Sequence, residues 1–287
     1  MKPEIRFDMS REDYDRRGEV NFSTLKLLGM KSPAHYHASL LAPVGGDTNA
    51  RQRGRAVHCA VLEPARFRTD FAVGGARRGT KKWKAALAAN VGKEVLTQDG
   101  YDEAVTMAKA ASAVAAARPY LSGGRSEATL LWPFVREAMG SLEGYEIPCR
   151  SRLDFIADCG AIVDLKTTRD ASPSGFGREV GRYGYHVQAA FYQEAYFAVT
   201  GKRLPYKFVA LEAAWPHVGA VYSLTADALE LGRETYCGWM DRLRECQRTN
   251  HWPGYGEGEM DVELPRYLMP DDDENYDLSG LVEKEAA

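Results

Sequence analysis

The sequence predicts an α/β (α+β) protein built around a mixed central β-sheet. The first 117 residues show mainly helix-like periodicity, whereas residues 127 to 166 are dense in β-forming side chains and turn signals. Strands that lie between helical groups are typical of folds in which helices cover a sheet. The 287 residues are 45% hydrophobic and 27% charged, which suits one large domain with a small appendage.

Caps and breakers predict the helices of the first half. Ser23 can cap "TLKLLGM", and Pro33 suits the first turn of "PAHYHASLLA". A helix from about 49 to 63 follows and ends before Pro64. The basic, glycine-marked stretch "GGARRGTKKWK" then separates it from an alanine-rich helix over 101–117.

The rest of the chain alternates strands and helices. Period-2 patterns and β-branched residues mark the strands, and apolar residues three to four apart mark the helices. In order, we expect strands over 127–135, 147–157 and 161–166, a helix over 182–199, strands over 205–214 and 218–224, and a last helix that Thr225 caps and that ends near residue 247.

Charge divides the chain unevenly. From residue 256 onward, eleven acidic side chains face two basic ones, so the net charge of −3 splits into −9 for this end and +6 for the rest. We expect a helical N-terminal segment over 1–48 packed on a main domain over 49–255, and an acidic, flexible tail over 256–287. The tail either solvates the protein or, alternatively, shields a basic groove or docks a partner.

Composition also bounds the location of the protein. No apolar run approaches the roughly 20 residues that span a bilayer, and the first residues lack a secretory pattern. The five cysteines are scattered without a CxxC pair, which argues against a disulfide framework and a zinc site. We therefore expect a cytoplasmic protein without a membrane partner.

The segment "RLDFIADCGAIVDLKTT", residues 152–168, predicts a β-hairpin that carries unexpected charges. If "DCG" is a three-residue turn with Gly160 in the left-handed conformation, residue 157 pairs with residue 161. Asp154 then lies directly across from Asp164. Because side chains alternate along strands, one face collects Arg152, Asp154, Asp164 and Lys166, and the opposite face collects Leu153, Phe155, Val163 and Leu165.

Two interpretations explain the opposed carboxylates. Like charges directly across a ladder are destabilising unless something positive lies between them. A divalent cation such as Mg²⁺ or Mn²⁺ would serve, and Lys166 would then orient or help deprotonate a water for phosphodiester hydrolysis. Alternatively, Arg152 and Lys166 simply neutralise Asp154 and Asp164 in a cross-strand ion cluster.

Several motifs in the same order resemble the PD-(D/E)xK nuclease superfamily, and most closely the RecE-like exonucleases of phages and prophages (exodeoxyribonuclease VIII type). The resemblance covers roughly residues 5–255. It rests on the hairpin and on "FDMSREDYDR", "LKLLGMKSPAHY", "GRAVHCAVLEP", "SEATLLW" and "YHVQAAFY", the last of which contains a QxxxY arrangement. Two departures are Leu153 where a proline is common and Asp164 where glutamate is commoner.

The resemblance implies a restriction-endonuclease-like core over 49–255 and a role for each motif residue. It implies that Mg²⁺ or Mn²⁺ binds the metal ligands His58, Asp154, Asp164 and the Leu165 carbonyl. Lys166 would be the catalytic lysine, and Glu127 would support a second metal or its water. Gln188 and Tyr192 would line the cleft. Without the resemblance, His58 also fits a packing residue, Glu127 a surface carboxylate, and Gln188 with Tyr192 a plain helix contact.

The function implied is a metal-dependent, ATP-independent 5′-to-3′ exonuclease on double-stranded DNA that generates 3′ single strands for phage-type recombination in a bacterial host. Relatives form rings, so a homo-oligomer and a single-strand annealing protein are the expected partners. A structure-specific or nicking endonuclease of the same fold and a non-catalytic DNA-binding module remain alternatives. Candidate DNA contacts are Arg152 and, near Trp83, Arg77, Arg78, Lys81 and Lys82, although a solvated loop fits the latter group as well.

Overall fold

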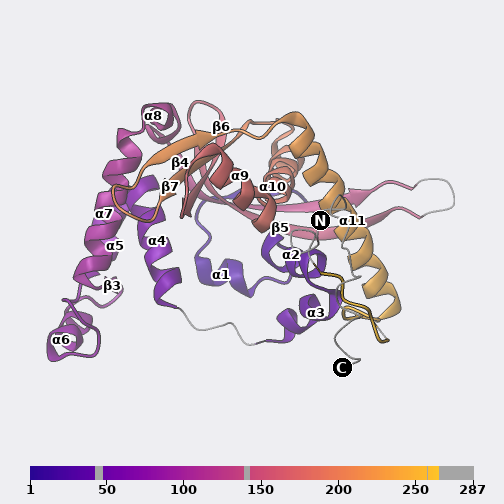
Figure 1. Cartoon of the computed structure of the whole chain (residues 1–287), viewed down its shortest axis with the longest axis horizontal. Coiled ribbons are helices and arrows are strands. Elements are labelled where there is room, and N and C mark those ends of the chain that lie inside the picture. The colour runs from indigo at the N-terminus through magenta and orange to yellow at the C-terminus, as the bar shows by residue number, and fades with distance from the viewer. Residues whose placement is uncertain (43–47, 139–142, 257, 265–287) are drawn as a thin grey trace, which may run out of the picture.

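A six-stranded mixed sheet runs through the molecule in the order β1-β4-β5-β6-β7-β8 (Figure 1). The computed structural model describes residues 1–42, 48–138, 143–256 and 258–264. The sheet is antiparallel except between β6 and β7, which pair in parallel. Its strands are β1 (Glu4–Arg6), β4 (Gly124–Arg136), β5 (Tyr145–Ala157), β6 (Ala161–Thr168), β7 (Tyr206–Glu212) and β8 (Gly219–Tyr222). The predicted fold class is confirmed.

Helices cover both faces of the sheet (Figure 1). On one side, α4 (Asn49–Leu62) and α7 (Gln98–Ala113) bury Val57 and Met107 against Val163 and Leu165 of β6. On the other side, α10 (Tyr185–Thr200) and α11 (Ala226–Thr249) bury large aromatic side chains against the strands. The remaining helices are α1 (Arg11–Arg16), α2 (Phe22–Met30), α3 (Pro33–Leu41), α5 (Pro64–Asp70), α6 (Lys81–Ala89), the 3₁₀ turn Ala115–Ala117, α8 (Arg118–Leu121) and α9 (Pro173–Tyr183).

Local chemistry explains where the helices begin and end. Thr48 and Thr225 accept backbone N–H bonds at the starts of α4 and α11, and Pro33 occupies the first turn of α3. Asn21, rather than Ser23, caps α2. The single helix expected over 182–199 is two helices, because Gly184 takes a left-handed φ of 67° that ends α9 and starts α10.

The N-terminal and basic segments contain elements that the sequence did not predict. β1 adds a strand to the main sheet beside β4. The basic stretch contains α6, between the short parallel strands β2 (Phe71–Val73) and β3 (Glu94–Leu96). Most of the acidic tail, residues 265–287, lies outside the described residues, so the expectation for it stays a prediction. None of the helices in the described ranges is long and apolar enough to cross a bilayer.

Helices α10 and α11 cross where a side chain would not fit. A Cβ on Gly232 of α11 would lie 2.4 Å from the His186 carbonyl oxygen on α10. We expect Gly232→Ala to lower the free energy of unfolding by about 2 kcal/mol, because the two backbones must separate. In the same helix, Gly238 has open space around it, so Gly238→Ala should raise stability by up to about 1 kcal/mol. Denaturant unfolding of both variants checks this, and equal effects would contradict it.

Candidate active site

The predicted hairpin forms, and its two strands separate just beyond their turn. Ala157 pairs with Ala161, and Gly160 has the left-handed φ of 82° that the turn requires. The ladder between β5 and β6 continues only as far as Phe155 opposite Val163. The next positions are Asp154 and Asp164, so the opposed aspartates lie where β5 leaves β6 and β6 continues beside β7. We call this point of separation between β5 and β6 the fork.

Asp154 replaces a missing ladder bond at this fork. Its Oδ2 accepts a hydrogen bond of 3.1 Å from the Leu165 backbone N–H. In a strand, the N–H and C=O of one residue point to the same neighbouring strand, so the Leu165 carbonyl also lies on the β5 side. A carboxylate and a carbonyl oxygen therefore share the mouth of the fork.

Asp164 is buried and holds three hydrogen-bonding groups. The Lys166 ammonium lies 3.0 Å from its Oδ1 and 2.8 Å from its Oδ2. The Tyr206 hydroxyl on β7 donates to Oδ2 at 2.9 Å. The carboxyl group of Asp154 is also in hydrogen-bond contact with it. The two aspartates thus have unequal partners, since Lys166 and Tyr206 both bind Asp164.

Helix α10 positions Lys166 from the other side. The Lys166 ammonium donates to Gln188 Oε1 at 3.0 Å and lies 4.5 Å from the centroid of the Tyr185 ring. Tyr192 follows one turn after Gln188 and packs against the ring of Phe22. Gln188 therefore fixes the lysine in position, and the N-terminus of α10 reaches the site because Gly184 reverses the chain before it.

His58 approaches from α4, on the opposite side of the fork. Its Nδ1 lies 3.4 Å from Asp154 Oδ2, and its side chain is 32% exposed. Burial lowers the pKa of His58, which leaves the imidazole neutral at pH 7 and able to bind a metal. The structure thus brings together the predicted residues His58, Asp154, Asp164, Leu165, Lys166, Gln188 and Tyr192.

Glu127 lies across from Asp154 in the β4–β5 register, its charge acts on Asp154 and His58, and its carboxylate pairs with Arg152. Glu127 has a left-handed φ of 54°, and the pairing of β4 with β5 skips it. The Arg152 guanidinium donates to the Glu127 carboxylate and to the Met9 and Ser10 carbonyls, and only 12% of its side chain is exposed. The prediction that Arg152 binds nucleic acid finds no support in these contacts.

The interrupted pairing also alters the apolar face of the hairpin. Phe155, Val163 and Leu165 pack with α4 and α7 as one cluster, as expected from the alternation. Leu153 instead packs with the aromatic cluster under α10 and α11. The expected common face is therefore wrong for Leu153, because the strand changes its course beside Glu127.

The basic stretch lies apart from the fork, at the far end of α7 (Figure 1). Trp83 is buried, and the Arg78 guanidinium lies 5.2 Å from its ring centroid. Arg78 also donates to Gln52. Trp83 is therefore a packing residue and not a free surface for stacking on a base. Lys81 and Lys82 are exposed, so a role for them and Arg77 in DNA binding stays a prediction.

Unequal surroundings give the two aspartates opposite pKa shifts. Burial and the neighbouring Asp164 raise the pKa of Asp154 well above its ordinary value. Burial acts in the same direction on Asp164, but Lys166 and the bonds from Asp154, Lys166 and Tyr206 outweigh it and lower its pKa. Burial opposes the charge of Lys166, yet both aspartates raise its pKa, so it is an ammonium.

These shifts predict how the metal-free protein responds to pH. A carboxyl group with a raised pKa in the folded state stabilises the protein below the unfolded pKa, and this contribution is lost as the pH rises through the folded pKa. In EDTA, the free energy of unfolding should therefore fall as the pH rises from about 4 through the raised pKa of Asp154. Asp164 acts only below this window, because its pKa is lowered.

Thermal unfolding across pH, with EDTA and with Mg²⁺, checks this expectation. A divalent ion should offset the loss, because it places positive charge between the carboxylates. The variant Asp154→Asn should flatten the pH dependence in EDTA. An unchanged slope in that variant would contradict the assignment to Asp154.

The donor set suits a hard divalent cation. Two carboxylates and a backbone carbonyl are oxygen ligands of the kind that Mg²⁺ and Mn²⁺ prefer, and a neutral imidazole is a nitrogen donor that suits transition-metal ions. Lys166 binds Asp164 and not Asp154, so the half-buried Asp154 carboxyl group lacks a cationic side chain bound to it among the described residues. Within the described ranges, no group of three or more His, Cys, Asp or Glu side chains is placed so that it could hold a metal ion by itself. Water and a phosphate oxygen would therefore have to complete the coordination.

Comparison with known proteins places this geometry in a fold class. The structure is similar to a crystal structure described as "Putative exonuclease" from Eubacterium rectale, with a TM-score of 0.60 and 15% sequence identity over 90% of this chain and 96% of that chain. At this identity the likeness shows the fold. The fold, with its hairpin aspartates and lysine, is that of PDDEXK-like nucleases.

The family assignment is direct. Residues 21–262 match the family described as "PDDEXK-like domain of unknown function (DUF3799)", so the chain belongs to that family. No protein with a curated description matches the chain. The predicted membership of the PD-(D/E)xK superfamily is confirmed, and the closer resemblance to RecE-like exonucleases stays a prediction.

Three contributors to the site were missed in the sequence. Tyr206 binds Asp164 from β7, Tyr185 lies under the Lys166 ammonium, and Gly184 turns the chain into α10. A glycine inside a predicted helix was a usable signal for the turn. Tyr206 gave no such signal, because its contact with Asp164, 42 residues earlier in the chain, depends on the register between β6 and β7.

Proposed function

We propose that this protein is a divalent-metal-dependent, ATP-independent exonuclease that digests double-stranded DNA from the 5′ end and leaves 3′ single strands for phage-type recombination. The observation that carries the proposal is the opposition of Asp154 and Asp164 at the fork, with Lys166 bound to Asp164. Membership of a PDDEXK-like family supports the hydrolytic chemistry. The end-dependence and the direction rest on the resemblance to RecE-like exonucleases.

The residues of the fork have distinct roles in this proposal. Asp154, Asp164, His58 and the Leu165 carbonyl would hold Mg²⁺ or Mn²⁺. When bound, the ion supplies Lewis-acid polarisation of a phosphate oxygen. Asp154 must lose its proton for this, which the ion favours by removing the repulsion that raises the pKa of Asp154.

Lys166 acts as a hydrogen-bond donor of fixed position. As an ammonium it cannot accept a proton, but it can orient the attacking water and stabilise negative charge that develops on the phosphate. Gln188 holds the ammonium beside Asp164. Little rearrangement is then needed when the DNA strand arrives.

The test is digestion of linear duplexes labelled at either 5′ or 3′ end, beside a covalently closed circle. We expect release of the 5′ label first in Mg²⁺, no release in EDTA and an intact circle. Cleavage of the circle would favour a structure-specific or nicking endonuclease. Binding without release of nucleotides in Mg²⁺ would favour a non-catalytic module.

The expected partners follow from the same resemblance. Duplex DNA would be enclosed by a homo-oligomeric ring, in which the positive charge of residues 1–255 from each subunit adds up along the channel. A single-strand annealing protein would bind the exposed 3′ strand in the cytoplasm of a bacterial host. Light scattering of the purified protein, with and without duplex DNA, tests the ring.

A further inference from the structure

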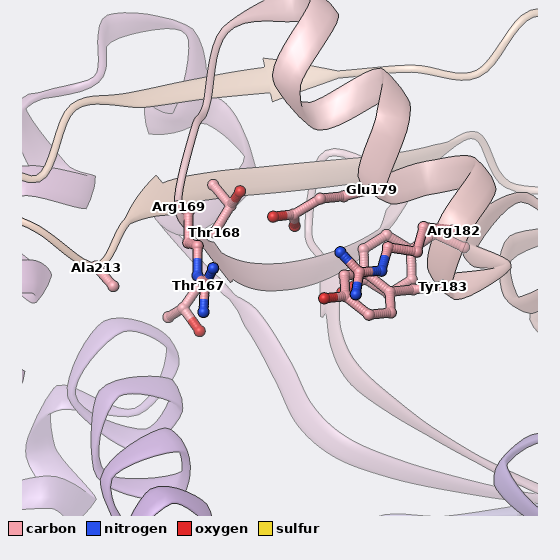
Figure 2. Close-up of a pocket in the computed structure, with 8 residues that line it drawn as sticks. Thr167, Thr168, Arg169, Glu179, Arg182, Tyr183 and Ala213 are labelled. Atoms are coloured by element: carbon pink, nitrogen blue, oxygen red, sulfur yellow. The ribbon is translucent and has the colours of Figure 1, made fainter. Parts of the chain in front are cut away.

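A pocket of about 350 Å³ is lined by Tyr185, the residue whose ring contacts the Lys166 ammonium. The pocket lies between the end of β6 with the residues that follow it and the last turns of α9. Figure 2 shows Thr167 and Arg169 on one side, Arg182 and Tyr183 on the other, and the Glu179 carboxylate between them. The lining is completed by Thr168, Tyr185 and Ala213.

The pocket and the catalytic centre share one wall. Tyr185 lines the pocket, and the Lys166 ammonium lies 4.5 Å from the centroid of its ring. Thr167 and Thr168 follow Lys166 directly along β6. A ligand in the pocket would therefore lie next to Tyr185, whose ring contacts the Lys166 ammonium.

The pocket carries uncompensated positive charge. Among the described residues, neither Arg169 nor Arg182 forms an ion pair with a carboxylate. Arg182 lies with its guanidinium 5.5 Å from the Tyr183 ring centroid, and the Lys26 ammonium from α2 lies 5.7 Å from the same ring. Two arginines thus line the pocket, and Glu179 is its single acidic lining residue.

Guanidinium groups without partners in a concave site bind phosphate well, because their N–H donors match its oxygens in pairs. The Thr167 and Tyr183 hydroxyls can add donors of the kind that contact DNA phosphates. We propose that this pocket binds a phosphate of the DNA strand being cut, next to the phosphate at which hydrolysis occurs. This inference rests on the proposed nuclease function and names a binding subsite for it.

Glu179 and the two arginines should change the affinity for DNA in opposite directions. A carboxylate in the pocket repels a phosphate, so Glu179→Gln should raise the affinity for DNA, whereas loss of the arginines should lower it. A purely structural role of these exposed side chains would not produce opposite changes from the two substitutions.

The test removes the contact between the phosphate and the arginines, once by changing the DNA and once by changing the protein. In one series of duplexes, each duplex carries one neutral methylphosphonate at a single position near the cleaved bond. A further pair of duplexes differs only in whether the 5′ end carries a phosphate or a hydroxyl. For the wild type, kcat/KM in Mg²⁺ should fall about tenfold when the phosphate that occupies the pocket is neutralised or absent. The double variant Arg169→Gln/Arg182→Gln should be slower by a similar factor on unmodified DNA and should lose no further activity from that change.

The position at which this coupling occurs identifies the phosphate as terminal or internal. Arg178→Gln is the matched control: it lies on the same helix, pairs with Asp170 and does not line the pocket, so it should keep the full penalty of the wild type. The proposal would be overturned if neutralising a phosphate lowered kcat/KM of the double variant as much as that of the wild type at every position. If the wild type cleaves no DNA, the proposed function fails, and the same comparison of binding affinities in Ca²⁺ decides on the pocket alone.

Discussion

Replacing Lys166 by alanine is expected to lower the rate of DNA cleavage by about a thousandfold or more, while DNA binding is retained. The ammonium is the single cation bound to the carboxyl pair in the described part of the chain, and it is held by both Asp164 and Gln188. The loss should appear in kcat rather than in KM, because the group stabilises charge that develops during hydrolysis. Single-turnover cleavage in Mg²⁺ and DNA binding in Ca²⁺ measure the two properties.

Two further variants separate chemistry from folding. Lys166→Ala also leaves Asp164 without its ion pair, so unfolding should be followed in parallel. Lys207→Ala removes a lysine of the adjacent strand β7 that binds Ser223 outside the site, and should leave cleavage unchanged. Gln188→Leu should cause a smaller loss, since it frees the ammonium without removing it. A Lys166→Ala protein that is folded and active would refute the proposed mechanism.

Substitutions of the two hairpin aspartates are expected to have different effects on protein stability and the same effect on cleavage. Asp154→Asn and Asp164→Asn should each abolish Mg²⁺-dependent cleavage, because each removes a metal ligand. In EDTA, Asp154→Asn should leave stability unchanged or raise it, since an amide oxygen can still accept from Leu165 N–H and the repulsion is gone. Asp164→Asn should destabilise by about 3–5 kcal/mol, because it removes the buried carboxylate that the Lys166 ammonium and the Tyr206 hydroxyl both bind.

Thermal unfolding in EDTA compares the variants, and titration with Mn²⁺ measures the loss of the ion. The wild type should gain stability from Mn²⁺, and neither variant should do so. Equal destabilisation by the two substitutions would indicate a symmetrical ion cluster in place of a metal site. This outcome is the one that the ion-cluster interpretation of the sequence requires.

The hairpin could be predicted because its determinants are local. The turn residue Gly160 fixes the register, and the register alone places Asp154 across from Asp164. The cap at Thr225 was equally predictable, since capping depends on adjacent residues. His58 could be assigned only through the resemblance, because nothing in a lone histidine on a helix shows which strand the helix covers.

The unequal environments of the aspartates could not be predicted. Sequence spacing treats Asp154 and Asp164 as equivalent, and the difference arises from Tyr206 on β7 and Gln188 on α10. Both contacts depend on tertiary packing. Glu127 was placed on the correct strand, but its pairing with Arg152 follows from a backbone conformation that is unusual for glutamate.

The short turn at residues 158–160 also limits how the protein can vary. One inserted residue would shift every later position of β6 by one place, so that Asp154 would face Val163 or Leu165 and the acidic pair would be lost. The number of residues in this connection thus determines whether the two carboxylates face each other. Homologues that retain the chemistry are therefore expected to keep this loop at constant length and to confine insertions and deletions to other connections.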